Sequence, residues 1–122
     1  MILFFCSLEH KEKEKEIFRI LEELLPSDQI EVHCSVRSLF QKLKKPMKDK
    51  PIVVVLIHQR KELLEITSIR EQFFQVYLVL ILPDAQKETI SLSHNLRPNY
   101  LTYMHSDLNE LKAVLEKILK RS

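Results

Sequence analysis

Two patterns of hydrophobic residues alternate along this chain, one typical of β-strands and one typical of amphipathic helices. Residues 52–57 and 76–82 are unbroken apolar runs, typical of strands that are buried on both faces of a parallel sheet. Residues 2–6 form a shorter apolar run, and residues 100–104 predict a short fifth strand. Residues 29–34 instead alternate apolar with polar side chains, which predicts a strand with one covered face at the edge of the sheet.

Between these strands, apolar residues recur at spacings of three and four, which predicts amphipathic helices. Short polar or proline-containing segments separate each helix from the next strand. The predicted helices cover residues 9–25, a segment that Ser35 caps and Pro46 ends, residues 61–73, residues 85–96 with Asp84 as the cap, and a last segment that opens at Ser106 and Asp107.

Strand and helix therefore alternate through the whole chain with short connections. Such alternation favours a parallel sheet with helices on both faces, because each parallel crossover carries a helix across the sheet. We expect one domain over residues 1–122, a three-layer α/β/α sandwich with a five-stranded parallel sheet. The half-polar second strand at an edge and the apolar third and fourth strands inside agree with the flavodoxin-like strand order 2-1-3-4-5.

The net charge and the hydropathy of the chain argue against several classes of function. A net charge of +2 gives no electrostatic support to nucleic-acid or membrane-surface binding, so neither is expected. Apolar runs stay far below the roughly 20 residues of a membrane helix. The apolar residues 2–6 lack the basic region and cleavage site of a signal peptide, so a cytoplasmic location is expected.

Glycine is absent from the chain, although its average usage is about 7%. Loops that cradle phosphates need glycine, because their backbone approaches the ligand closely or takes positive φ. A P-loop and a dinucleotide-binding GxGxxG motif are therefore both excluded, and no cofactor is expected.

Candidate reactive side chains follow the predicted strands. Ligands of parallel α/β sheets gather at the carboxyl ends of the strands. The residues that stand there include Cys6, Cys34, His58, Asp84 and His105. This edge of the sheet is the only place where the sequence brings such residues together.

Two stretches near these strands resemble the receiver domain of response regulators (CheY-like). Residues 80–90 are similar to the receiver's fourth strand and the start of its following helix, and residues 63–70 are similar to its third helix. With the order and lengths of the elements, the resemblance extends over nearly the full chain. It implies the flavodoxin-like fold and a place in two-component signalling, a bacterial phosphorelay.

The functional residues of a receiver are not found at the matching positions. Receivers carry paired acids after strand one, an aspartate that accepts the phosphoryl group at the end of strand three, a Ser or Thr at the end of strand four, and a Lys before a cis-proline at the end of strand five. The matching residues here are Cys6 and Ser7 with Glu9 as the nearest acid, then Ile57 and His58, then Leu82, then Tyr103 and Met104. Phosphoryl transfer needs a carboxylate acceptor and cations that neutralise the developing charge, so the chain is expected to be a pseudo-receiver without enzyme activity.

What remains of a receiver's function is recognition of other proteins. In receivers the fourth helix, fifth strand and fifth helix form the face for dimerisation and output, and here that face would include Leu96, Tyr100, Tyr103 and Leu111. Tyr100 matches the receiver's switch aromatic, although a strand residue that packs on the last helix is the simpler explanation of it. We expect a protein partner or a second copy of the chain to bind this face.

Two alternatives remain. Cys6, Cys34, His58 and His105 are thiol and imidazole groups that suit Zn²⁺, although no CxxC or HxxxH spacing supports a metal site. Cys6 at the end of the first strand also resembles the phosphocysteine loop of a sugar phosphotransferase IIB domain. That chemistry needs backbone N–H groups around the phosphate, and Glu9 and Glu12 would oppose an anion there.

Overall fold

A computed structural model describes residues 1–7 and 11–121 of the chain. Its centre is one five-stranded sheet in the order β2-β1-β3-β4-β5, and every neighbouring pair of strands is parallel. This is the flavodoxin-like α/β fold, as predicted. The strands are β1 (Ile2–Phe5), β2 (Ile30–His33), β3 (Ile52–Leu56), β4 (Tyr77–Leu82) and β5 (Tyr100–Tyr103).

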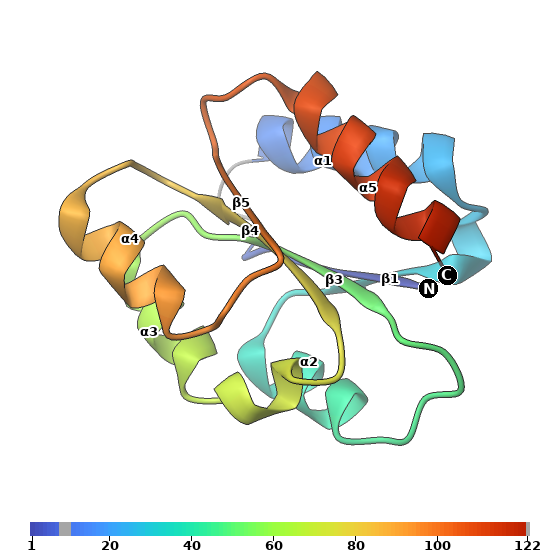
Figure 1. Ribbon diagram of the computed structural model, residues 1–122, viewed down its shortest axis with the longest axis horizontal. Helices are drawn as coiled ribbons and strands as arrows, with labels where there is room; N and C mark the ends of the chain where they lie inside the picture. Colours follow the sequence, from blue (N-terminus) through green and yellow to red (C-terminus); the bar gives the residue numbers. More distant parts are fainter. Residues whose placement is uncertain (8–10, 122) are drawn as a thin grey trace.

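Helices cover both faces of this sheet. On one face lie α1 and α5, and on the other lie α2, α3 and α4 (Figure 1). The helices are α1 (Lys11–Leu24), α2 (Val36–Leu43), α3 (Arg60–Thr67), α4 (Lys87–His94) and α5 (Leu108–Arg121), with short 3-10 turns η1 (Ser27–Gln29) and η2 (Arg70–Phe73).

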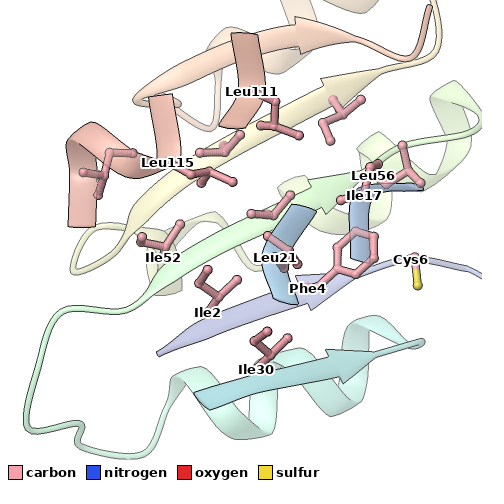
Figure 2. Close-up of a cluster of buried hydrophobic side chains, with 14 of the residues drawn as sticks. Ile2, Phe4, Cys6, Ile17, Leu21, Ile30, Ile52, Leu56, Leu111 and Leu115 are labelled. Atoms are coloured by element: carbon pink, nitrogen blue, oxygen red, sulfur yellow. The ribbon is translucent and has the colours of Figure 1, made fainter. Parts of the chain in front are cut away.

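The sheet divides the hydrophobic core in two. Successive side chains of a strand point to opposite faces, so Ile52 and Val54 pack toward α1 and α5 while Val53 and Val55 pack toward α2 and α3. All five residues of β3 are buried. Figure 2 shows the first of these clusters, in which Phe4 and Ile2 of β1 lie beneath Ile17 and Leu21 of α1.

The helices predicted over residues 61–73 and 85–96 are both shorter in the structure. The prediction of one helix over residues 61–73 is wrong, because α3 ends at Thr67 and η2 follows separately. The Thr67 hydroxyl donates to the Leu63 carbonyl at 2.8 Å, and the Ser68 hydroxyl donates to the Glu65 carbonyl, which also accepts from the Ser68 N–H at 3.2 Å. These hydroxyl groups compete with backbone N–H groups for the carbonyls of the last helical turn. The predicted start of α1 at residue 9 lies outside the described residues.

Of the two helix N-caps predicted at Ser35 and Asp84, the structure contains the first and lacks the second. Ser35 caps α2, since its hydroxyl accepts from the Ser38 N–H at 3.1 Å. Asp84 does not cap α4: its Oδ1 accepts from the Gln86 N–H at 3.0 Å, and Gln86 is the residue before the helix. Asp84 thus forms a tight turn that delays the start of α4.

Candidate functional site

The carboxyl ends of the five strands lie at one end of the sheet, where the side chain of His58 is enclosed by the protein. It follows β3, and its side chain is 1% exposed. Cys6 is buried in the apolar cluster beneath α1, whereas Cys34 and His105 are exposed. Cys6, Cys34, His58 and His105, which the sequence placed together at the strand ends, therefore differ strongly in their access to solvent.

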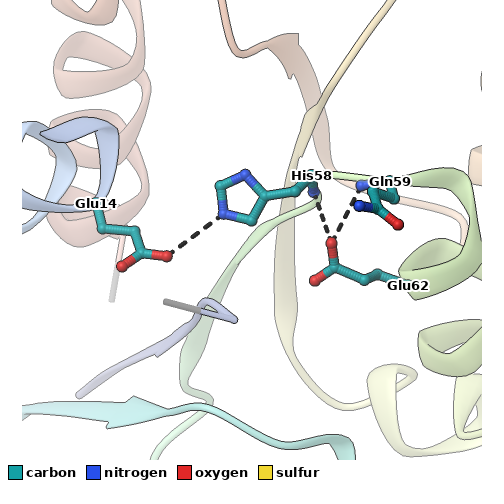
Figure 3. A network of polar contacts seen from close by, with 4 residues as sticks. All are labelled: Glu14, His58, Gln59 and Glu62. Atoms are coloured by element: carbon teal, nitrogen blue, oxygen red, sulfur yellow. Dashed lines mark hydrogen bonds and ion pairs between the residues drawn. The ribbon is translucent and has the colours of Figure 1, made fainter. Parts of the chain in front are cut away.

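The His58 imidazole contacts a carboxylate from another layer of the molecule. Its Nε2 lies 3.4 Å from Oε1 of Glu14, which belongs to α1 and has a side chain only 8% exposed (Figure 3). Burying a carboxylate is costly unless a partner compensates for the lost water, and His58 supplies that partner. The pair ties the end of the central strand to the helix above it.

The backbone around His58 is held from the opposite side by Glu62. Its Oε1 accepts from the N–H groups of both His58 and Gln59, each at 3.1 Å (Figure 3). These N–H groups precede the first turn of α3 and have no partner within the helix, so the carboxylate caps them. His58 is consequently fixed at its backbone by α3 and at its ring by α1.

Glu14 was missed by the sequence analysis. It lies in a run of alternating charges, residues 11–16, whose spacing by itself suggests a solvated helix face. One pair of this run, Lys13 with Glu16 at 3.6 Å, is indeed partly exposed. Glu14 differs because it precedes Ile17 by three residues and Leu21 by seven, which places it on the buried stripe of α1. This spacing is the signal in the sequence that could have identified it.

A second polar group links the loops after β3 and β4. Arg60, the first residue of α3, donates from Nη2 to Gln86 Oε1 at 2.8 Å and from Nε to Thr89 Oγ1 at 3.4 Å. A hydrogen bond from Thr89, another from the Gln86 backbone and the nearby Arg60 charge together hold the pKa of Asp84 below its ordinary value. Arg60 also lies 3.9 Å from Glu88. These contacts fasten α4 to α3, and the sequence analysis did not single out Arg60.

The carboxyl ends of the strands differ in several ways from a pocket that accepts a phosphoryl group. Residue 58 offers an imidazole where a carboxylate would be needed, and Leu82 is fully buried among the core residues on the α3 side. Tyr103 packs against the same cluster. Glu9, the acid expected nearest to the loop after β1, lies outside the described residues. The arrangement of His58, Glu14 and Glu62 is suited to joining three elements.

Among residues 1–7 and 11–121, no group of three or more His, Cys, Asp or Glu side chains is placed to hold a metal ion. The thiol of Cys6 is 2% exposed within an apolar cluster, which does not favour a nucleophile that must meet a phosphorylated substrate. Neither alternative gains support from the geometry of the strand ends.

The predicted interaction face divides into core and surface. Leu96 and Leu111 are 3% and 1% exposed, so they pack inside the protein and offer no contact area to a partner. Tyr100 and Tyr103 are half-buried and lie on opposite faces of β5, Tyr100 toward α5 and Tyr103 toward α4. Burial and a neighbouring Glu110 raise the pKa of Tyr100. The accessible part of this face is therefore the open edge of β5 with its two tyrosines.

Comparison of the chain with protein-family models, with curated proteins and with solved structures finds no match. No helix in the described part of the chain is long and apolar enough to span a membrane.

Proposed function

We propose that this chain is a pseudo-receiver: a cytoplasmic signalling module that binds a protein partner without phosphorylation. The observation that carries the proposal is His58. It stands where the resemblance to receivers puts the phosphoryl-accepting aspartate, and it is enclosed and bound to Glu14 at 3.4 Å. The position therefore offers a buried imidazole and no carboxylate that could accept a phosphoryl group as a receiver aspartate does.

The surface that we assign to the partner is the edge of the sheet formed by β5, between α4 and α5. The edge strand presents backbone groups that no neighbouring strand in the described chain pairs. Tyr100 and Tyr103 flank this edge on its two sides, and half-exposed tyrosines are enriched in protein interfaces. A small positive net charge and the lack of a phosphate-binding loop fit a protein ligand better than a nucleic acid or nucleotide.

The first experiment tests the independence from phosphorylation. The purified chain is incubated with acetyl phosphate and Mg²⁺ and examined by intact-mass spectrometry. We expect no phosphoryl adduct on the wild type or on the Glu62→Gln variant, which removes an acid near residue 58. A stoichiometric phosphoryl adduct, on a carboxylate or on an imidazole, would overturn the proposal, because the module would then accept a phosphoryl group.

The second experiment identifies the partner and the surface. A photo-crosslinking amino acid replaces Tyr103 in one variant and Phe74 in a matched control, since Phe74 is also aromatic and is 61% exposed on another part of the molecule. A protein captured only at position 103 is then purified and titrated against the wild type and Tyr103→Ala. We expect Tyr103→Ala to weaken binding at least about tenfold, a loss of about 1.4 kcal/mol, and acetyl phosphate to leave the Kd unchanged. Equal binding by both chains would remove the β5 edge from the proposal.

A further inference from the structure

The opposite edge of the sheet carries an apolar side chain that nothing in the described chain covers. β2 is the outer strand there, and Val32 in its middle is 45% exposed, far more than the neighbouring Ile30 at 9%. Figure 2 shows β2 with Ile30 inside the cluster and no strand beyond it. Exposed apolar edge strands invite pairing with another strand, and proteins usually protect them with charges or proline.

The backbone of β2 is also available at this edge. The His33 carbonyl accepts from the Cys6 N–H at 3.1 Å, so the backbone groups of His33, and of Glu31 two residues earlier, point toward β1. Because successive residues of a strand alternate, the N–H and C=O of Val32 point outward. The outward-facing backbone and the exposed side chain therefore belong to the same residue.

A groove runs beside Val32, between β2 and α1. Its volume is about 690 Å³, and its floor is formed by Phe4, Cys6, Phe18 and Val32. Charged residues of α1 line the rest: Glu14 and Lys15 in the first half of the helix, Arg19 past its middle and Glu22 toward its end. Glu14 is buried against His58, so the exposed charges along the rim change from positive at Lys15 and Arg19 to negative at Glu22. An occupant of this groove must be apolar beside Val32 and must match a rim that changes sign along its length.

We propose that a second copy of this chain occupies the edge, with the two β2 strands antiparallel about a two-fold axis at Val32. The two Val32 residues then exchange both backbone hydrogen bonds and place their side chains together on the α1 face. The same axis sets Glu31 of each copy opposite His33 of the other. The two five-stranded sheets become one continuous sheet.

The charges of β2 favour this register over a neighbouring one. An axis at Glu31 would set two carboxylates against each other, and like charges directly opposite are destabilising. Glu31 already lies 2.9 Å from Lys42 and 3.3 Å from His33 of its own chain. Its hydrogen bond with Lys42 holds its pKa below the ordinary value, so it is a carboxylate at neutral pH. The second copy adds an imidazole to an acid that is already charged.

The helices above the edge fit the same axis. The two-fold rotation makes the two α1 helices antiparallel, so the Lys15 end of one groove faces the Glu22 end of the other. A second copy thus supplies an apolar contact beside the floor of the groove and opposite charges along its rim. This interface leaves the β5 edge open, because β2 and β5 are the two opposite edges of the sheet.

Sedimentation velocity over a concentration series tests the proposal on the full chain. We expect the wild type to sediment as two chains and Val32→Lys as one, with far-ultraviolet circular dichroism unchanged. Leu64→Lys is the matched control, because Leu64 is a 54% exposed aliphatic residue on α3 and lies outside the groove. It should remain a dimer. A wild type that stays a single chain at about 100 μM, or a Val32→Lys variant that stays a dimer, overturns the proposal.

Disulfide trapping tests the register and also decides the case if Val32→Lys fails to fold. In the proposed register the Cα atoms at position 32 are about 5.5 Å apart, within the range of a disulfide, whereas the two Cys34 residues are offset by about 14 Å along the strands. We expect Val32→Cys in a Cys34→Ser background to form a covalent dimer under mild oxidation, and the wild type with its exposed Cys34 to form none. Cross-linking through Cys34 alone would refute this register.

Discussion

His58 Nε2 lies 3.4 Å from Glu14 Oε1, and the two residues are 44 positions apart in the sequence. Their side chains are 1% and 8% exposed, so the contact is made almost without water. It joins the helix layer above the sheet to the end of the central strand. This relationship is the basis of the proposed function, and its energetic contribution can be measured.

Glu14→Ala is expected to lower the free energy of unfolding by about 1–3 kcal/mol, because the buried contact between the Glu14 carboxylate and the His58 ring is lost. Glu16→Ala is the control, since Glu16 lies on the same helix with a side chain 53% exposed, and it should change stability by about 0.5 kcal/mol or less. Urea denaturation measures both. Replacing both partners by apolar residues, as Glu14→Leu with His58→Phe, should recover most of the loss. Equal effects of the two alanine variants would show that the buried contact contributes nothing special.

Because of Asp84, we expect the free energy of unfolding to depend on pH in the acid range. Its pKa is lowered in the folded protein, first by the hydrogen bond from Thr89, so its contribution to stability is full above its unfolded pKa of about 3.9 and is lost as the pH falls through the lower folded value. Asp84→Asn should therefore be less stable than the wild type near pH 6, and the difference should shrink in strong acid. Denaturant midpoints measured across this range check the prediction. A difference that stays constant with pH would exclude Asp84 as its source.

We expect the phenol of Tyr100 to titrate late at alkaline pH. Burial and the Glu110 carboxylate raise its pKa, so the folded protein favours the neutral phenol, and this contribution is lost as the pH rises through the folded value. We expect tyrosinate absorbance of the wild type to show one phenol that titrates above the ordinary value of about 10, absent from Tyr100→Phe. Glu110→Gln should move that titration to lower pH. If Tyr103→Phe removed the late titration instead, the assignment to Tyr100 would be wrong.

Arg97 is the one described non-glycine residue with positive φ, at 50°, between the end of α4 and Pro98. A side chain in this region costs about 1–2 kcal/mol, whereas glycine adopts it freely but gains entropy in the unfolded chain. Arg97→Gly should therefore raise the free energy of unfolding by about 0.5 kcal/mol. Arg97→Ala keeps the Cβ atom and is the control, with no such gain. Thermal and urea unfolding would show the difference.

The hydrophobic pattern predicted the sheet because the information is local. The unbroken apolar run of β3 indicates a strand covered on both faces, and the alternation in β2 indicates one covered face. These patterns predicted that β3 lies inside the sheet and β2 at its edge. The break after Thr67 was not predicted, because apolar spacing continues through it while the hydroxyl groups compete for carbonyls. The spacing of Glu14 from Ile17 and Leu21 places it on the buried stripe of α1, but its partner His58, 44 residues away, is brought near only in the folded chain. Leu96 and Leu111 were assigned to a surface for the same reason: exposure depends on packing.

β3 contributes side chains to both halves of the core, Ile52 and Val54 to one and Val53 and Val55 to the other. Neither helical layer can therefore complete its packing until this strand has been synthesised. As the chain leaves the ribosome, the segment before residue 52 has no central strand to pair with β1, and folding must wait for it. In the finished protein the amide hydrogens of β3 should be among the last to exchange with deuterium, since they are released only when the whole domain opens.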